Sequence, residues 1–156
     1  MRIKLGFTLI ELLVVIAVIA IIALAGGLLL LQQNRQQALV NGAETLRAFL
    51  RDAQQRAILQ EEGFYWGVEL ENVAAPDRDR YSLVSAPDTI PSSTNLVSTG
   101  YFKSILNLRE PAEGKTAIVL FEKISGEAVN ETAIILGLAG GNQAITIKIY
   151  KDGRIE

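Results

Sequence analysis

Glu11 is a single carboxylate at the start of a long apolar run, Leu12 to Leu31, that contains no other charged residue. At 1.5 Å per residue, a helix over this run would be about 30 Å long, which matches the hydrocarbon core of a bilayer. A carboxylate in such a place is costly unless it has a positive partner. Because the run offers no basic residue, the sequence predicts that Glu11 pairs with a charge from elsewhere.

The rest of the chain offers little conventional catalytic chemistry. It has 156 residues, a formal net charge of −2, and neither Cys nor His. These absences exclude a disulfide framework, a Cys/His metal site, a thiol nucleophile and a Ser-His-Asp triad. The charge balance gives no reason to expect nucleic acid as the main partner. We therefore expect a protein that is not an enzyme and that needs no cofactor.

Three kinds of N-terminal segment fit at least part of this pattern. Arg2 and Lys4 precede the apolar run, and basic flanks stay on the cytoplasmic side, so we expect the C-terminal part to be exported. A secretory signal would have a shorter apolar core followed by a small-x-small cleavage site, whereas Ala23 and Ala25 lie inside the run. A plain signal anchor explains the length and the charges but gives no reason for Glu11.

The third kind accounts for all of these features. The segment Gly6 to Glu11 (GFTLIE), with a short basic leader before it and LLVVIA after it, closely resembles the N-terminal signal of type IV prepilins and type II secretion pseudopilins. The resemblance implies that a membrane peptidase and methyltransferase cuts between Gly6 and Phe7 and methylates the new amine of Phe7. That amine carries a positive charge, and N-methylation preserves it.

The same resemblance implies a partner for Glu11, namely the Phe7 ammonium of a neighbouring subunit in a filament. The alternative is that Glu11 only marks the interfacial end of an anchor helix. On the first interpretation the chain is a structural subunit, a minor pilin or pseudopilin of a type IV pilus or type II secretion filament. Its partners would be the prepilin peptidase, other pilin subunits and membrane lipid, and it would reside in the inner (cytoplasmic) membrane before assembly.

Two other functions stay open. One is a DNA-binding minor pilin of an uptake pilus, which would contact DNA through a small basic patch at Lys148, Lys151 and Arg154. A solvated edge strand is the simpler interpretation of these residues. The other is a plain membrane-anchored exported domain that does not assemble.

The elements that position these residues follow from hydrophobic periodicity. We divide the chain into a leader (1–6), a transmembrane or filament-core helix (7–31), an amphipathic continuation of that helix (32–62) and a β-rich globular head (63–156). Apolar residues recur at spacings of three and four in the amphipathic part, at Leu39, Ala43, Leu46, Leu50, Ala53 and Ala57. Asn41-Gly42 is a possible break in the helix, and Gly63 is a possible C-cap.

The head has the alternating pattern of a sheet. We expect strands at 64–71, 80–84, 103–108, 117–121, 132–138 and 144–150, with a long loop at 86–100. A hairpin should join the last two strands through Ala139 to Asn142, and residues 154–156 should fold back as a short edge. The expected fold is α+β, a long N-terminal helix packed on a mostly antiparallel sheet, and this pattern resembles the H-type minor pseudopilins and related minor pilins.

Acidic residues in the head form no clear catalytic or metal site. Glu69 and Glu71 share one face of an expected strand, for which a solvated face is the simpler interpretation. Asp77 and Asp79 lie in a turn without the full ligand loop that calcium requires. We expect the neighbouring aromatic residues, including Trp66, to seal the core between helix and sheet.

Overall fold

The computed structural model describes residues 8–90 and 94–156, apart from the side chains of residues 24–31. The chain forms two compact units, Met1–Gln36 and Gln37–Glu156, which we treat separately. The predicted leader and the junction between Gly6 and Phe7 lie outside the described residues.

One helix, α1 (Leu9–Ile58), contributes residues to both units. In the second unit its buried positions are those of the predicted apolar stripe, from Leu39 to Ala57. The helix ends before the expected boundary at residue 62, because Gln60 adopts a left-handed conformation (φ 53°). The prediction that Gly63 caps this helix is therefore wrong, and Gly63 instead ends the short 3₁₀ turn η1 (Glu61–Gly63).

The predicted break at Asn41-Gly42 is also wrong, since α1 is continuous there. Gly42 has a packing role instead. A Cβ added at this position would lie 2.6 Å from Leu106 Cδ1 and 3.2 Å from Leu136 Cδ2. Glycine lets the helix backbone approach these two core leucines closely, at the expense of some helix propensity.

The first sheet has four antiparallel strands in the order β3-β2-β1-β5. They are β1 (Tyr65–Glu71), β2 (Arg80–Ala86), β3 (Asn95–Tyr101) and β5 (Thr116–Phe121). The prediction of a loop throughout 86–100 is wrong for its last part, because β3 forms there and pairs with β2.

The second sheet has three antiparallel strands in the order β4-β6-β7. They are β4 (Leu106–Glu110), β6 (Thr132–Leu138) and β7 (Ala144–Ile149). The predicted hairpin between β6 and β7 is confirmed. The chain end also folds back as expected, with Ile155 bridging to Ile149.

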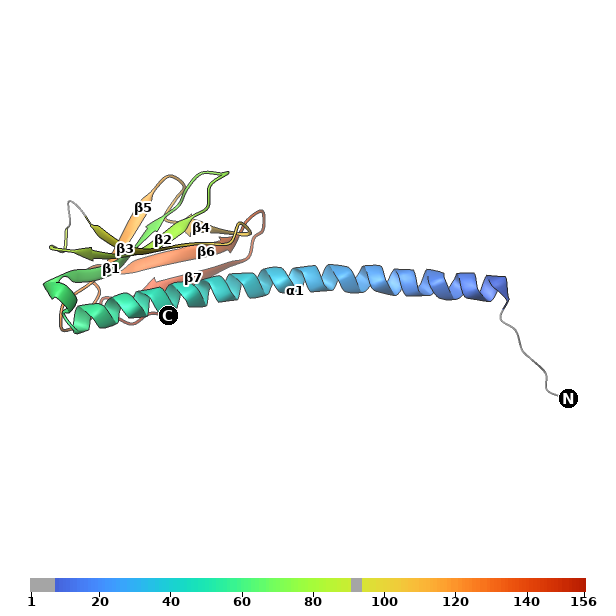
Figure 1. The fold of residues 1–156 in the computed structure, drawn as a ribbon, viewed down its shortest axis with the longest axis horizontal. Helices are drawn as coiled ribbons and strands as arrows, with labels where there is room; N and C mark the ends of the chain where they lie inside the picture. Colours follow the sequence, from blue (N-terminus) through green and yellow to red (C-terminus); the bar gives the residue numbers. More distant parts are fainter. Residues whose placement is uncertain (1–7, 91–93) are drawn as a thin grey trace. The chain divides into compact units, whose positions relative to one another are not determined.

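A single core joins the rear part of α1 to the inner faces of both sheets (Figure 1). Trp66 is buried in this core, and its indole N–H donates to the Glu61 carbonyl at 3.0 Å. The Tyr81 ring lies edge-on to Phe49, with 4.7 Å between ring centroids. The expected α+β class, a helix packed on antiparallel sheet, is therefore confirmed.

Tyr81 makes folding sensitive to alkaline pH. Burial raises the pKa of its phenol, so the folded state favours the neutral form. This contribution to stability is complete below the unfolded pKa of about 10 and is lost as the pH rises through it towards the folded pKa. We expect Tyr81→Phe to flatten the fall in melting temperature between about pH 9 and about pH 11. Tyr101→Phe, at an exposed tyrosine, is the control, and equal slopes for wild type and Tyr81→Phe would contradict the assignment.

Candidate functional site

Thr8 forms the N-cap of α1. Its hydroxyl oxygen accepts the Glu11 N–H at 3.3 Å, and its carbonyl accepts the Leu12 N–H at 3.2 Å. The first of these bonds satisfies one of the four N–H groups that have no partner within the first turn of a helix. Thr8 therefore fixes where the helix begins and places Glu11 in its first turn.

This role of Thr8 was not predicted, although its signal is present in the sequence. Thr-x-x-Glu is the pattern of a capping box, in which the third residue after the cap is an acid or its amide. A carboxylate in the first turn also interacts favourably with the positive end of the helix dipole. Glu11 therefore stabilises the helix start of its own chain in addition to any bond that it makes with another chain.

The described front part of α1 exposes its apolar side chains over its whole circumference. Leu9 and Ile10 are 82% and 72% exposed, and every residue from Thr8 to Ala23 is exposed. A continuous apolar surface of this kind marks a site for protein or lipid contact. Within the described residues, no helix meets the length and hydropathy required of a membrane span. The predicted segment at 7–31 includes residues outside that description.

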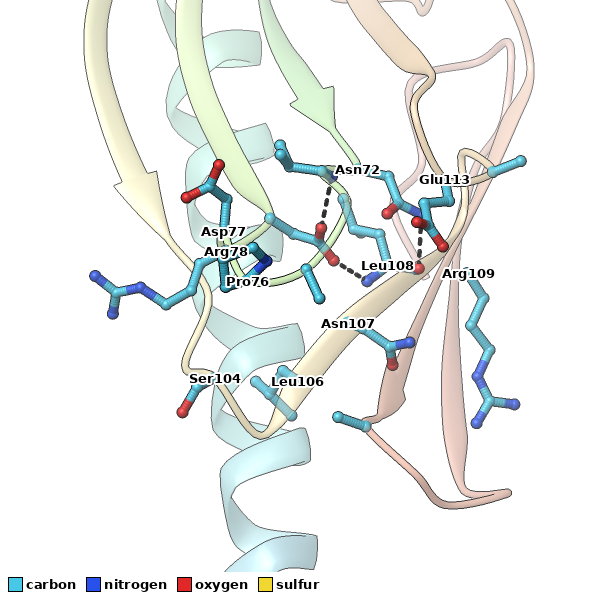
Figure 2. A pocket seen from close by; sticks show the side chains of 15 residues that line it. Asn72, Pro76, Asp77, Arg78, Ser104, Leu106, Asn107, Leu108, Arg109 and Glu113 are labelled. Atoms are coloured by element: carbon cyan, nitrogen blue, oxygen red, sulfur yellow. Dashed lines mark hydrogen bonds between the residues drawn. The ribbon is translucent and has the colours of Figure 1, made fainter.

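The head contains a cavity of about 600 Å³ between the connection from β1 to β2 and strand β4 (Figure 2). Two buried polar side chains in its wall, Asn72 and Asp79, join the two sheets. Asn72 Nδ2 donates to the carbonyls of Leu108 and Pro111 at 2.8 and 2.7 Å. Asp79 accepts the N–H groups of Val73 and Leu108 at 2.8 and 2.5 Å. Both side chains are thus occupied in holding β4 against the first sheet.

Two basic residues around this cavity, Arg78 and Arg109, have partners outside it. The Arg78 guanidinium lies 5.5 Å from the centroid of the Tyr101 ring. The Arg109 guanidinium donates to the carbonyls of Gly141 and Gln143. In 8–90 and 94–156, no three potential metal ligands of the Asp, Glu, Cys or His type come together. The cavity therefore has a structural explanation, and Asp79 serves as a bridge between sheets.

Glu69 and Glu71 share the outer face of β1, as predicted, but each has its own partner. Glu69 accepts the Thr94 hydroxyl at 3.1 Å, and Glu71 accepts the Arg80 guanidinium at 2.7 Å. The hydrogen bond and the charge of Glu71 raise the pKa of Arg80. The two carboxylates are thus used separately and do not form an acid pair.

The basic residues near the C-terminus lie among acidic ones. Arg154 forms ion pairs with Asp152 at 2.8 Å and with Glu156 at 3.4 Å. The hydrogen bond to Asp152 raises the pKa of Arg154, and the hydrogen bonds from Arg154 lower the pKa of Asp152. Lys148 and Lys151 are exposed nearby. These ion pairs reduce the net positive charge of the patch at Lys148, Lys151 and Arg154.

Comparison with known proteins gives two findings. Residues 1–27 match the family model described as the prokaryotic N-terminal methylation motif. The described fold is similar to the crystal structure of the type IV minor pilin FimU from Pseudomonas aeruginosa strain PAO1, with 20% sequence identity and a TM-score of 0.50. That similarity covers 76% of this chain and 90% of the FimU chain. No curated protein sequence matches the chain.

The two findings differ in how much of the chain they cover. The motif covers the region of Glu11, and the structural similarity extends over most of the chain. At this low identity the similarity to FimU establishes the fold alone, and the motif covers residues 1–27. The chain thus combines an N-terminal methylation motif with an α+β fold similar to that of a type IV minor pilin.

Proposed function

We propose that this chain is a structural minor pilin or pseudopilin subunit, cut between Gly6 and Phe7, methylated at Phe7 and assembled through the front of α1. The observation that carries the proposal is the methylation motif at residues 1–27. The exposed apolar side chains between Leu9 and Ile22 supply the contact surface that such an assembly needs. Lipid would cover this surface before assembly, and the helices of other subunits would cover it afterwards.

Glu11 would direct the contact between subunits. Cleavage after Gly6 creates an α-ammonium at Phe7, and the carboxylate of Glu11 on a neighbouring chain can neutralise it within the apolar surroundings. The Thr8 cap supports this arrangement because it fixes the start of the helix and therefore the position of Glu11 in its first turn. A subunit without the carboxylate would leave the neighbouring ammonium unpaired, which is strongly unfavourable in a low dielectric.

The partners and location follow from the same proposal. The chain would insert into the inner membrane with its N-terminus in the cytoplasm. The prepilin peptidase and methyltransferase would process it there, and it would then assemble with other pilin subunits. Within this class of proteins, we propose an H-type minor subunit, because the chain has one long helix followed by a β-rich head. DNA is the less favoured partner, because Asp152 and Glu156 pair with Arg154 in the basic patch.

Filament incorporation tests this function. The full chain, tagged at its C-terminus, is expressed in its source cells, and surface filaments are sheared off and separated from membranes. We expect the tagged chain in the sheared fraction. Detection in the membrane fraction alone, in cells that make normal filaments, would contradict the proposal and favour a plain anchored domain.

A further inference from the structure

The two sheets of the head have four edge strands, and the chain itself fully covers two of them. A bare edge exposes a row of N–H and C=O groups that can pair with another strand. The edge of β7 is covered by the chain end, since Lys148 and Glu156 exchange two main-chain hydrogen bonds of 3.0 Å. The edge of β4 is closed by side chains, because Asp79 and Asn72 bond the N–H and C=O of Leu108.

Strand β5 is covered over only one half. Val129 N–H donates to the Leu120 carbonyl at 2.9 Å, and Ala128 bridges to Phe121. Among the described residues, no main-chain hydrogen bond covers the outer side of the other half, Thr116–Val119. Ile118 in this open half is 39% exposed.

Strand β3 is the other open edge. In the part of the chain that the structure describes, no hydrogen bond covers its outer side. It contains neither a charged residue nor proline, the usual means of protecting an edge, and it exposes the apolar side chains of Leu96 and Tyr101. Val97 is an extra residue relative to β2, so the regular part of this edge is Ser98–Tyr101.

We propose that β3 of one subunit pairs with the open half of β5 of a second copy, so that the four-stranded sheet continues from one head to the next. All neighbouring strands in the order β3-β2-β1-β5 are antiparallel, so the two edge strands run in opposite directions. A second copy in the same orientation therefore brings its β5 antiparallel to β3. This contact is heterologous, and such contacts build open assemblies.

The common orientation of subunits rests on the proposed function, in which every N-terminus lies on the same side of the membrane or points the same way in the filament. That orientation excludes antiparallel pairing of β3 with β3. Such a pair would be related by a two-fold axis perpendicular to the sheet, which would reverse the direction of the second subunit. Pairing between β3 and β5 requires no reversal.

The register follows from the rows of side chains on the outer face of the sheet. One row runs Tyr101, Arg80, Glu71, Thr116, and the next runs Thr99, Ser82, Glu69, Ile118. Continuing both rows without a shift places Tyr101 beside Thr116 of the next copy and Thr99 beside Ile118. These facing side chains are uncharged, so no like-charge repulsion opposes the pairing.

Disulfide formation in the full chain tests this register, because the natural sequence contains no Cys. Pairs of single-cysteine chains with different tags are coexpressed in the source cells, and mild oxidant is applied to the membranes and to sheared filaments. We expect linked heterodimers from Thr99→Cys with Ile118→Cys and from Tyr101→Cys with Thr116→Cys, since facing residues in a sheet approach closely enough for a disulfide. The matched control is Ser98→Cys with Ile118→Cys, whose side chains would point to opposite faces of the sheet.

Three results would overturn the inference. The first is that disulfides form only between chains that carry the same cysteine. The second is that the control pair is linked as strongly as the matched pairs. The third is that no disulfide forms in either the membranes or the sheared filaments. Recovery of each variant in sheared filaments is measured on the same samples. Unlinked subunits in filaments overturn the sheet contact alone, whereas failure to reach filaments counts against the proposed function.

Discussion

Glu11→Gln and Glu11→Ala are both expected to reduce incorporation of the chain into filaments by at least about tenfold. Removing one partner of a desolvated charge pair typically costs about 2–5 kcal/mol, and 1.4 kcal/mol corresponds to about tenfold in an equilibrium. The loss would fall on assembly and leave membrane insertion intact, because an apolar run without Glu11 is easier to insert. The measurement is the ratio of variant to wild-type chain in sheared filaments when both are coexpressed with different tags.

The two variants separate charge pairing from a merely polar role of the side chain. Both keep the main-chain N–H of residue 11 that bonds to the Thr8 hydroxyl, and Gln is polar but cannot neutralise an ammonium. Normal incorporation of Glu11→Gln together with loss of Glu11→Ala would show that a polar side chain is sufficient and would contradict charge pairing. Thr8→Ser, which keeps the hydroxyl, and Thr8→Val, which removes it, measure the contribution of the cap alone.

Asp79→Ala is expected to destabilise the head by about 2–5 kcal/mol. The substitution leaves the N–H groups of Val73 and Leu108 without a partner, and each buried unsatisfied group costs about 1–3 kcal/mol. A loss of this size is a large part of the stability of a small domain. The measurement is the urea midpoint of the full chain in detergent, followed through the single Trp, Trp66, which is buried in the core.

Asp77→Ala is the matched control, because Asp77 lies in the same turn but is exposed. Its free energy of unfolding should stay within about 0.5 kcal/mol of that of the wild type. Equal midpoints for the Asp79 and Asp77 variants would contradict the role of Asp79 as a bridge between the two sheets. If Asp79→Ala lowers the stability but unfolding in urea stays cooperative, both sheets unfold together.

Strongly periodic segments of this chain could be predicted from the sequence. The apolar stripe from Leu39 to Ala57 recurs at spacings of three and four over several turns, and all its members are buried as expected. Strand β6 has the predicted bounds, and the hairpin to β7 forms through Ala139 to Asn142. In these segments, local propensity and tertiary packing favour the same structure.

Predictions failed where a neighbour in space decides the conformation. The composition before Tyr101, rich in Ser and Thr, favours a loop, but β2 supplies a hydrogen-bond ladder and β3 forms. Asn41-Gly42 has the local pattern of a break, yet Leu106, far along the chain, makes Gly42 a close-packing position. Sequence pattern alone contains neither contact.

The candidate site was predicted in part. Glu11 is conspicuous because it is a charge in an apolar run, and the structure places it in the first turn of α1. The part played by Thr8 in positioning it was not predicted, since the cap is a neutral hydroxyl and does not stand out in an uncharged run. Asp79 was weighed as a metal ligand, whereas its partners are two backbone N–H groups that only the fold brings near.

The most direct test of the central claim is the intact mass of the mature protein, with fragmentation of its N-terminal peptide. The account predicts a chain that lacks residues 1–6, begins at Phe7 and carries one methyl group on its α-amine. A mature chain that retains the leader, or begins at any other residue, would contradict processing after Gly6. It would also remove the ammonium that is proposed to be the partner of Glu11.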